Sequence, residues 1–250
     1  MVFPALTFHL TMSDVSSVST PDGPMGLHWA IPKAAAGLRS LPGILVFQEA
    51  FGVNRHIVSV CERLAAAGYV AVAPELFHRE GTGLTFGYND FNSVRPIFSR
   101  MSNEGLVADI RASHQALRDY PLVDPARIYA IGFCLGGFVA VLAAMHVPLA
   151  SAAAFYGGGL TKGRPGVGLT PLIDGFGQID CRTLFVFGEK DSGIPAEDVA
   201  LIRSRLEALH KPHEIEVYPD AGHGFFCEDR PVYNPQAAAA AWDRALAWLR

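Results

Sequence analysis

Short apolar runs alternate along the chain with longer stretches in which apolar residues recur every three or four positions. Apolar runs without polar alternation are typical of parallel strands that are buried on both faces. Runs of this kind occupy residues 43–48, 70–73, 127–133, 152–156 and 183–187. Residues 214–218 alternate between polar and apolar and predict a further strand.

Helical patterns lie between these runs. Apolar residues in 57–64 recur at i, i+3, i+4 and i+7, and Gly68 then ends the predicted helix. Further helices are predicted over residues 106–117, 135–146, 199–209 and 237–249. Strands that alternate with helices are joined by right-handed crossovers, so the sequence predicts an α/β fold with a doubly wound, mostly parallel sheet flanked by helices.

The length and composition fit one domain. The chain has 250 residues, half of them hydrophobic, which is enough to bury a sizeable core. We therefore expect a single domain over residues 1–250, with a loosely ordered N-terminal segment over about residues 1–25. Residues 13–24 are polar and rich in turn formers, which fits either an edge hairpin or a leader.

Charge and cysteine content narrow the partners and the compartment. A net charge of −4 argues against nucleic acid or an anionic membrane as partner, because both attract basic surfaces. The N-terminus lacks the basic region and cleavage site of a signal peptide, and no apolar stretch reaches the roughly 18 residues of a membrane span. The four cysteines form no CxxC pair, which favours a reducing, cytoplasmic location. The sequence leaves monomer or dimer open.

Cys134 lies where the strand at 127–133 meets the helix at 135–146. Gly132 and Gly136 flank it in the pattern Gly-x-Cys-x-Gly, which is typical of a nucleophile elbow with sulfur in place of oxygen. Active sites in such sheets lie at the carboxyl ends of the strands, and a helix N-terminus favours the thiolate. The alternative is that Cys134 is a small buried hydrophobe, as most free cysteines are.

Loops after two later strands supply an acid and a base in the order expected for this fold. Asp191 follows the strand at 183–187 and is the predicted acid. His223 lies in a glycine-flanked loop after the strand at 214–218 and is the predicted base. Spacing alone leaves Glu189 open as a competitor of Asp191.

A metal site is not expected from the histidine spacing. His210 and His213 are three residues apart, but Pro212 interrupts the helix that would align them, and the sequence suggests no third ligand. Acyl transfer from a thiol nucleophile requires no cofactor. We therefore expect neither a metal nor a cofactor.

Five motifs together resemble the dienelactone hydrolase family of the α/β-hydrolase fold. They are QEAFG (48–52), APELF (73–77), IGFCLGG (131–137), LFVFGEKDSGIP (184–195) and YPDAGHGFF (218–226). The resemblance runs from about Gly43 to the C-terminus. It implies a hydrolase that cleaves a lactone or small carboxylic ester through a Cys-His-Asp triad and a thioester acyl-enzyme.

The resemblance also implies residues around the nucleophile. Glu49 matches a family glutamate that contacts the nucleophilic cysteine and takes the thiol proton when substrate binds. A charged Glu49 disfavours the thiolate, so we expect a neutral thiol in the resting protein. The elbow itself assigns one oxyanion donor to the backbone N–H of Leu135, and the family assigns the second to Ala50.

Substrate recognition is the least defined part of the prediction. Arg79 fits the first of two arginines with which the family binds a carboxylate. The second position departs from the family, because Cys227 follows the histidine motif and the nearest arginine is Arg230. Tyr156, at the end of a strand, and Tyr88, in the non-periodic segment 81–100, are further candidates for substrate binding. Aromatic packing beneath a loop explains that segment equally well.

Two alternatives remain open at this stage. The same cysteine chemistry also serves an esterase or thioesterase of other specificity. A protein with this scaffold can instead bind a ligand or sense redox state without turnover, because a fold does not determine a function.

Overall fold

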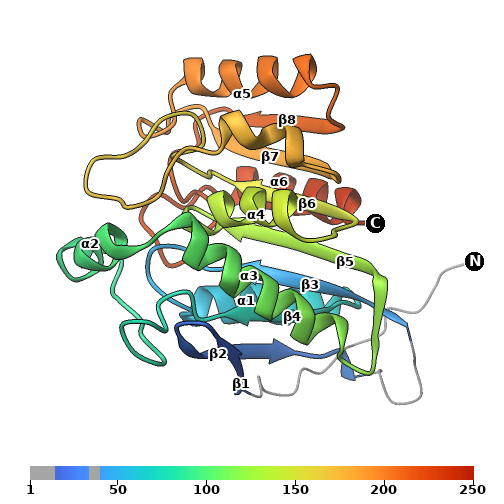
Figure 1. The fold of residues 1–250 in the computed structure, drawn as a ribbon. Coiled ribbons are helices and arrows are strands. Elements are labelled where there is room, and N and C mark those ends of the chain that lie inside the picture. Colours follow the sequence, from blue (N-terminus) through green and yellow to red (C-terminus); the bar gives the residue numbers. More distant parts are fainter. Residues whose placement is uncertain (1–14, 34–39) are drawn as a thin grey trace, which may run out of the picture.

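One mixed sheet forms the centre of the protein, whose computed structural model describes residues 15–33 and 40–250 (Figure 1). Its strands are β1 (Val15–Thr20), β2 (Gly23–Ala30), β3 (Leu41–Phe47), β4 (Val70–Pro74), β5 (Val123–Phe133), β6 (Ser151–Phe155), β7 (Arg182–Gly188) and β8 (His213–Tyr218). They follow the order β1-β2-β4-β3-β5-β6-β7-β8. Pairing is antiparallel at β1–β2 and β2–β4 and parallel from β4 onward. The predicted mostly parallel sheet is confirmed.

Helices cover both faces of the sheet. They are α1 (Arg55–Ala66), α2 (Phe91–Arg100), α3 (Asn103–Arg118), α4 (Leu135–His146), α5 (Ala196–Ala208), α6 (Pro235–Trp248) and the 3₁₀ helix η2 (Ile173–Gln178). Figure 1 shows α3 and α4 in front of the sheet and α1 and α6 behind it. Every residue of β4 and β6 is buried, which explains why these strands lack polar alternation.

Asparagine and serine side chains mark the starts of three helices. Asn54 accepts a hydrogen bond from the Ile57 backbone N–H at 3.2 Å and caps α1. Ser102 caps α3 through the Gly105 N–H at 3.1 Å, and Asn234 likewise caps α6. Each cap satisfies one of the amides that a helix N-terminus leaves without an intrahelical acceptor.

Two segments go beyond the sequence prediction. The segment 81–100 shows no periodicity in the sequence, but its second half is helix α2, which Asp90 caps through Ser93. Pro96 inside this helix and its short buried face of Val94 and Ile97 explain why no periodicity was visible. Residues 15–25, for which the sequence left a loosely ordered segment, a leader and an edge hairpin open, belong to the β1–β2 hairpin at the sheet edge, and the expectation for residues 1–14 lies outside the described part of the chain.

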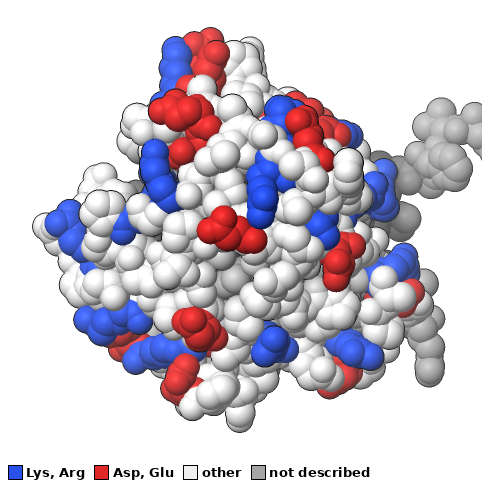
Figure 2. Space-filling model, turned by 45° about the horizontal axis from the view of Figure 1, so that its top comes forward, with Lys and Arg blue, Asp and Glu red and all other residues white. Residues whose placement is uncertain are grey.

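The described surface carries interspersed charges. On the face drawn in Figure 2, acidic and basic side chains alternate without gathering into one patch of either sign. Among the helices within residues 15–33 and 40–250, none combines the length and the apolar character that crossing a bilayer requires.

Candidate active site

The turn between β5 and α4 holds Cys134 in a strained backbone conformation. Its φ is 54°, in the left-handed region that residues with side chains rarely adopt. A Cβ on Gly132 would lie 1.9 Å from the carbonyl oxygen of Gly136, and one on Gly136 would lie 2.1 Å from that of Phe47. Both glycines are therefore required for the close approach of the elbow.

Asp191 and His223 come together at the same edge of the sheet, because β7 and β8 pair in parallel. Oδ2 of Asp191 lies 2.7 Å from Nδ1 of His223, and its Oδ1 accepts a hydrogen bond from the Gly193 N–H at 2.9 Å. Asp191 is buried whereas Glu189 is exposed. The contact favours Asp191 over Glu189 as the predicted acid, and it leaves Nε2 of the imidazole for the predicted interaction with Cys134.

Cys134 and His223 stabilise each other's charged forms. Burial alone would raise the pKa of the Cys134 thiol, but the charge of His223 and a hydrogen bond with it outweigh burial, so the pKa is lowered. Burial would lower the pKa of His223, but the Cys134 charge and the hydrogen bond with Asp191 raise it to about 10. The arrangement favours a thiolate–imidazolium pair.

Glu49 is fully buried directly after β3. Its Oε1 lies 3.5 Å from Nη1 of Arg230, and its Oε2 has no hydrogen-bond partner among the described residues. Burial raises the pKa of Glu49 despite the opposing charges of Arg230 and His223. Burial disfavours the charge on Glu49, and the effect of Glu49 on the Cys134 pKa is smaller than that of His223, so the neutral resting thiol stays a prediction.

Leu135 directly follows Cys134 in the elbow, and Ala50 follows β3, the strand that pairs with β5. Leu135 is the first residue of α4, where a backbone N–H has no intrahelical acceptor. Phe47, the last residue of β3, pairs with Gly132 near the end of β5. The segment that follows β3 and carries Ala50 therefore begins beside the same turn. The structure therefore brings both predicted oxyanion donors to the edge that carries Cys134.

A pocket next to Cys134 has mostly apolar walls. Its lining includes Phe98, Leu135, Phe138, Arg164, Val167 and Leu169. Arg164 is the charged side chain in this lining, and its Nη2 donates a hydrogen bond to the Gly193 carbonyl at 2.8 Å. Sequence reasoning did not find Arg164, because it carries no motif; the available signal was its position in the loop that follows the carboxyl end of β6.

The two tyrosines lie around Glu49. Tyr156 is fully buried with a φ of 39°, and its ring centroid lies 5.2 Å from that of His223. The hydroxyl of Tyr156 lowers the pKa of Glu49. Within the described residues, this hydroxyl makes no hydrogen bond of standard geometry. The hydroxyl of Tyr88 accepts hydrogen bonds from Cys227 Sγ and Asn54 Nδ2, each at 3.2 Å.

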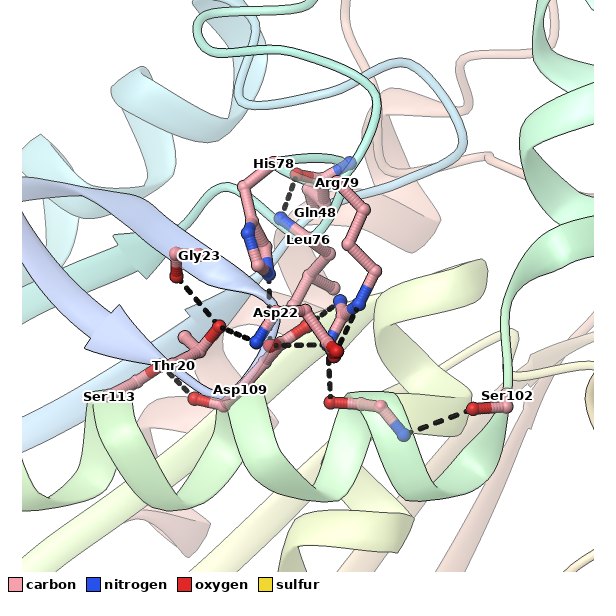
Figure 3. Close-up of polar contacts among 11 residues, drawn as sticks. Thr20, Asp22, Gly23, Gln48, Leu76, His78, Arg79, Ser102, Asp109 and Ser113 are labelled. Carbon is pink, nitrogen blue, oxygen red and sulfur yellow. Dashed lines mark hydrogen bonds and ion pairs between the residues drawn. The ribbon is translucent and has the colours of Figure 1, made fainter.

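Arg79 is held elsewhere (Figure 3). Its Nη1 donates to Oδ2 of Asp109 at 2.7 Å, and its Nε and Nη2 donate to Asp22 at 2.9 and 2.6 Å. The side chain of Asp109 is fully buried and also contacts Nε2 of His78 at 3.0 Å. Arg79 does not line the Cys134 pocket. The predicted substrate contact of Arg79 therefore stays a prediction, and it would require this ion pair with a buried carboxylate to open.

Comparisons with known proteins agree on one family. A sequence model of the dienelactone hydrolase family matches residues 27–250. A Salmonella typhimurium protein named "Putative carboxymethylenebutenolidase" is 37% identical over 250 aligned residues, covering 94% of this chain and 86% of its own. A Synechocystis protein of the same name is 37% identical over 205 residues, covering 81% and 83%. The crystal structure titled "Putative Dienelactone Hydrolase" from Klebsiella pneumoniae superposes with a TM-score of 0.86 at 32% identity, covering 95% of this chain and 98% of that one.

Proposed function

Because this chain belongs to the dienelactone hydrolase family of carboxylic ester hydrolases, we propose that it cleaves a lactone or small carboxylic ester by acyl transfer through Cys134, His223 and Asp191. The observation that carries the proposal is the 2.7 Å contact between Asp191 Oδ2 and His223 Nδ1 at the sheet edge where the strained elbow holds Cys134, and the lowered pKa of the Cys134 thiol agrees with it. A thiolate is the nucleophilic form of cysteine, and an oriented imidazolium is a ready proton donor.

The first half-reaction forms a thioester. The Cys134 thiolate attacks the carbonyl carbon, and the backbone N–H groups of Leu135 and Ala50 bind the developing oxyanion, each worth about 3 kcal/mol in the transition state. When the intermediate collapses, the C–O bond breaks and the alkoxide takes the proton from Nε2 of His223. In a lactone the leaving oxygen stays tethered to the acyl group.

The second half-reaction regenerates the thiolate. Neutral His223 removes a proton from water, and the hydroxide attacks the thioester carbonyl. The C–S bond then breaks, which releases the carboxylic acid and restores the thiolate–imidazolium pair. Asp191 keeps Nδ1 protonated and oriented throughout.

Glu49 is proposed to tune the nucleophile. Neutral Glu49, the form that burial favours, does not repel the negative charge of the Cys134 thiolate. In its charged form it raises the Cys134 pKa. The alternative role, implied by the family resemblance, is that Glu49 itself accepts the thiol proton. Burial raises the pKa of Glu49, and Arg230, which contacts Glu49, acts in the opposite direction.

Arg164 is proposed to bind an anionic group of the substrate. It is the charged side chain in the otherwise largely apolar lining beside Cys134, whereas Arg79 is committed to Asp109 and Asp22. A planar guanidinium matches a carboxylate in two parallel hydrogen bonds. The substrate would then carry an apolar body and a carboxylate, and the four free cysteines fit action in a reducing, cytoplasmic compartment.

Hydrolysis by the purified protein tests the proposal. The substrates are a dienelactone and p-nitrophenyl acetate, assayed with the native protein and with Cys134→Ala. Turnover that disappears in the variant, together with a thioester adduct on Cys134 detected by mass spectrometry, is the expected result. Oxidation of Cys134 without turnover of either substrate would instead indicate the redox-sensing alternative.

A further inference from the structure

Gln48 is a buried amide at the carboxyl end of β3. It directly follows that strand and is 1% exposed. Its Oε1 accepts a hydrogen bond from the Leu76 backbone N–H at 3.2 Å (Figure 3), and its Nε2 donates one to the Glu49 backbone carbonyl at 3.4 Å. Leu76 lies in the turn after β4, the parallel neighbour of β3. The side chain of Gln48 therefore links the two segments that leave these neighbouring strands.

The Glu49 carbonyl belongs to the same peptide group as the Ala50 N–H. This peptide bond is trans, so its C=O and its N–H point in opposite directions. Because the Gln48 amide holds the carbonyl on one side, it directs the Ala50 N–H to the other side. A rotation of this peptide group would break the hydrogen bond and turn the N–H away from its present direction.

The nucleophile elbow packs against the same segment. A Cβ on Gly136 would lie 2.7 Å from the Gln48 carbonyl oxygen, and Gly136 is the second residue after Cys134. The Ala50 N–H is thus two residues along the chain from a direct backbone contact with the elbow. We propose that Gln48 is a positioning residue whose side chain orients the Ala50 N–H toward the oxyanion formed when Cys134 attacks an ester.

This inference rests on the proposed function, in which Leu135 and Ala50 donate to the oxyanion, and the two donors are held differently. Helix α4 fixes the N–H of Leu135, its first residue. Ala50 lies in a turn between β3 and α1, where a side chain must supply the orientation that a helix or strand would give. Oxyanion donors stabilise the transition state because they are aimed before the charge develops. A loosely held Ala50 peptide would lose part of that effect.

Two reactions of Cys134 separate this role from general support of the elbow. Hydrolysis of p-nitrophenyl acetate passes through an oxyanion. Alkylation by iodoacetamide forms the S–C bond as iodide leaves a saturated carbon, so no oxyanion arises. In the full-length chain, Gln48→Met removes both hydrogen bonds from a side chain of similar length. We expect kcat for the ester to fall by about 10–100-fold with KM within about threefold of the native value. The rate and pH midpoint of alkylation should stay within experimental error of the native values.

Two further variants complete the test. Thr183→Val is the matched control, because it removes a buried hydrogen bond to a backbone carbonyl of the same 3.4 Å length at the amino end of β7. It should change neither reaction. Gln48→Asn keeps the amide on a side chain one methylene shorter, which cannot reach Leu76 and the Glu49 carbonyl together. It should also lower kcat without changing alkylation, and it decides the question if circular dichroism shows Gln48→Met to be unfolded.

Two results would overturn the inference alone. One is a kcat in the folded Gln48 variant equal to that of an active native protein. The other is an equal loss in hydrolysis and alkylation, which would show that Gln48 supports the elbow as a whole. If the native protein hydrolyses neither a dienelactone nor p-nitrophenyl acetate, the proposed function fails and this inference fails with it.

Discussion

Oδ2 of Asp191 lies 2.7 Å from Nδ1 of His223, although the two residues lie 32 positions apart in the chain. With Asp191 as the acceptor, the proton of neutral His223 lies on Nδ1, and Nε2 is left for Cys134. Asp191→Asn would favour the wrong tautomer, so we expect kcat to fall by about 10²–10⁴-fold. Stopped-flow or steady-state assays with p-nitrophenyl acetate measure this loss.

Glu189→Gln is the matched control for Asp191→Asn. Glu189 lies two residues away in the same turn, but its side chain is exposed. We expect activity within about twofold of the native protein, because an exposed carboxylate is screened by water. A large loss in Glu189→Gln with none in Asp191→Asn would exchange the roles of the two acids.

The pH dependence of thiol reactivity tests the ion pair. The Cys134 pKa is lowered, chiefly by His223 acting against burial, so thiolate is present at pH values below its ordinary range near 9. Alkylation by iodoacetamide should therefore have its midpoint below pH 9, and in His223→Ala the midpoint should move upward. A native midpoint at or above pH 9 would contradict the thiolate–imidazolium pair.

The alkaline limb of the activity profile tests His223 itself. Its pKa is raised to about 10, so the imidazolium that protonates the leaving alkoxide is present below that pH and is lost above it. We expect kcat/KM to fall as the pH rises through about 10. The measurement is kcat/KM between about pH 6 and 11. A fall centred near pH 6.5, the ordinary histidine value, would show that Cys134 and Asp191 do not stabilise the imidazolium.

Glu49→Gln separates the two roles considered for Glu49. Burial raises the pKa of this carboxyl group, and glutamine resembles its neutral form in size and polarity. If Glu49 only tunes Cys134, kcat/KM should stay within about threefold of the native value, since neutral Glu49 is already favoured. A loss of about 100-fold, typical of removing a general base, would show that Glu49 accepts the thiol proton. The measurement is kcat/KM of both proteins at one pH, chosen where kcat/KM of the native protein does not change with pH.

The sequence predicted those parts of the site that follow from strand ends. Cys134, Asp191 and His223 each follow a predicted strand, and parallel strands bring their carboxyl ends to one edge. The ion pair of Arg79 was not predicted, because its partner, Asp109, belongs to helix α3, 30 residues away, and no local pattern encodes that pairing. Arg164 was missed for the same reason, since its place beside Cys134 depends on how loops from separate elements meet.

Arg164→Gln should change the preference for anionic substrates more than the rate of the chemical step. A charged hydrogen bond contributes about 1.5–3 kcal/mol, so kcat/KM for a lactone that carries a carboxylate should fall by about 10–100-fold, mostly through KM. Hydrolysis of neutral p-nitrophenyl acetate should change by less than about threefold. Equal losses for both substrates would show that Arg164 holds the Gly193 turn rather than the substrate.

Arg79→Gln should affect stability and leave substrate preference unchanged. Asp109 is fully buried, and Arg79 gives it two hydrogen bonds at 2.7 and 3.0 Å (Figure 3). Without the guanidinium, His78 is the remaining contact described for the buried carboxylate, so we expect a loss of about 1–3 kcal/mol in the free energy of unfolding. Urea denaturation measures it. Arg100→Gln, which breaks an exposed ion pair with Glu80, is the control and should cost well under about 1 kcal/mol. If Arg79→Gln instead raises KM for an anionic lactone at unchanged stability, Arg79 does reach the substrate, and its ion pair with Asp109 must open during binding.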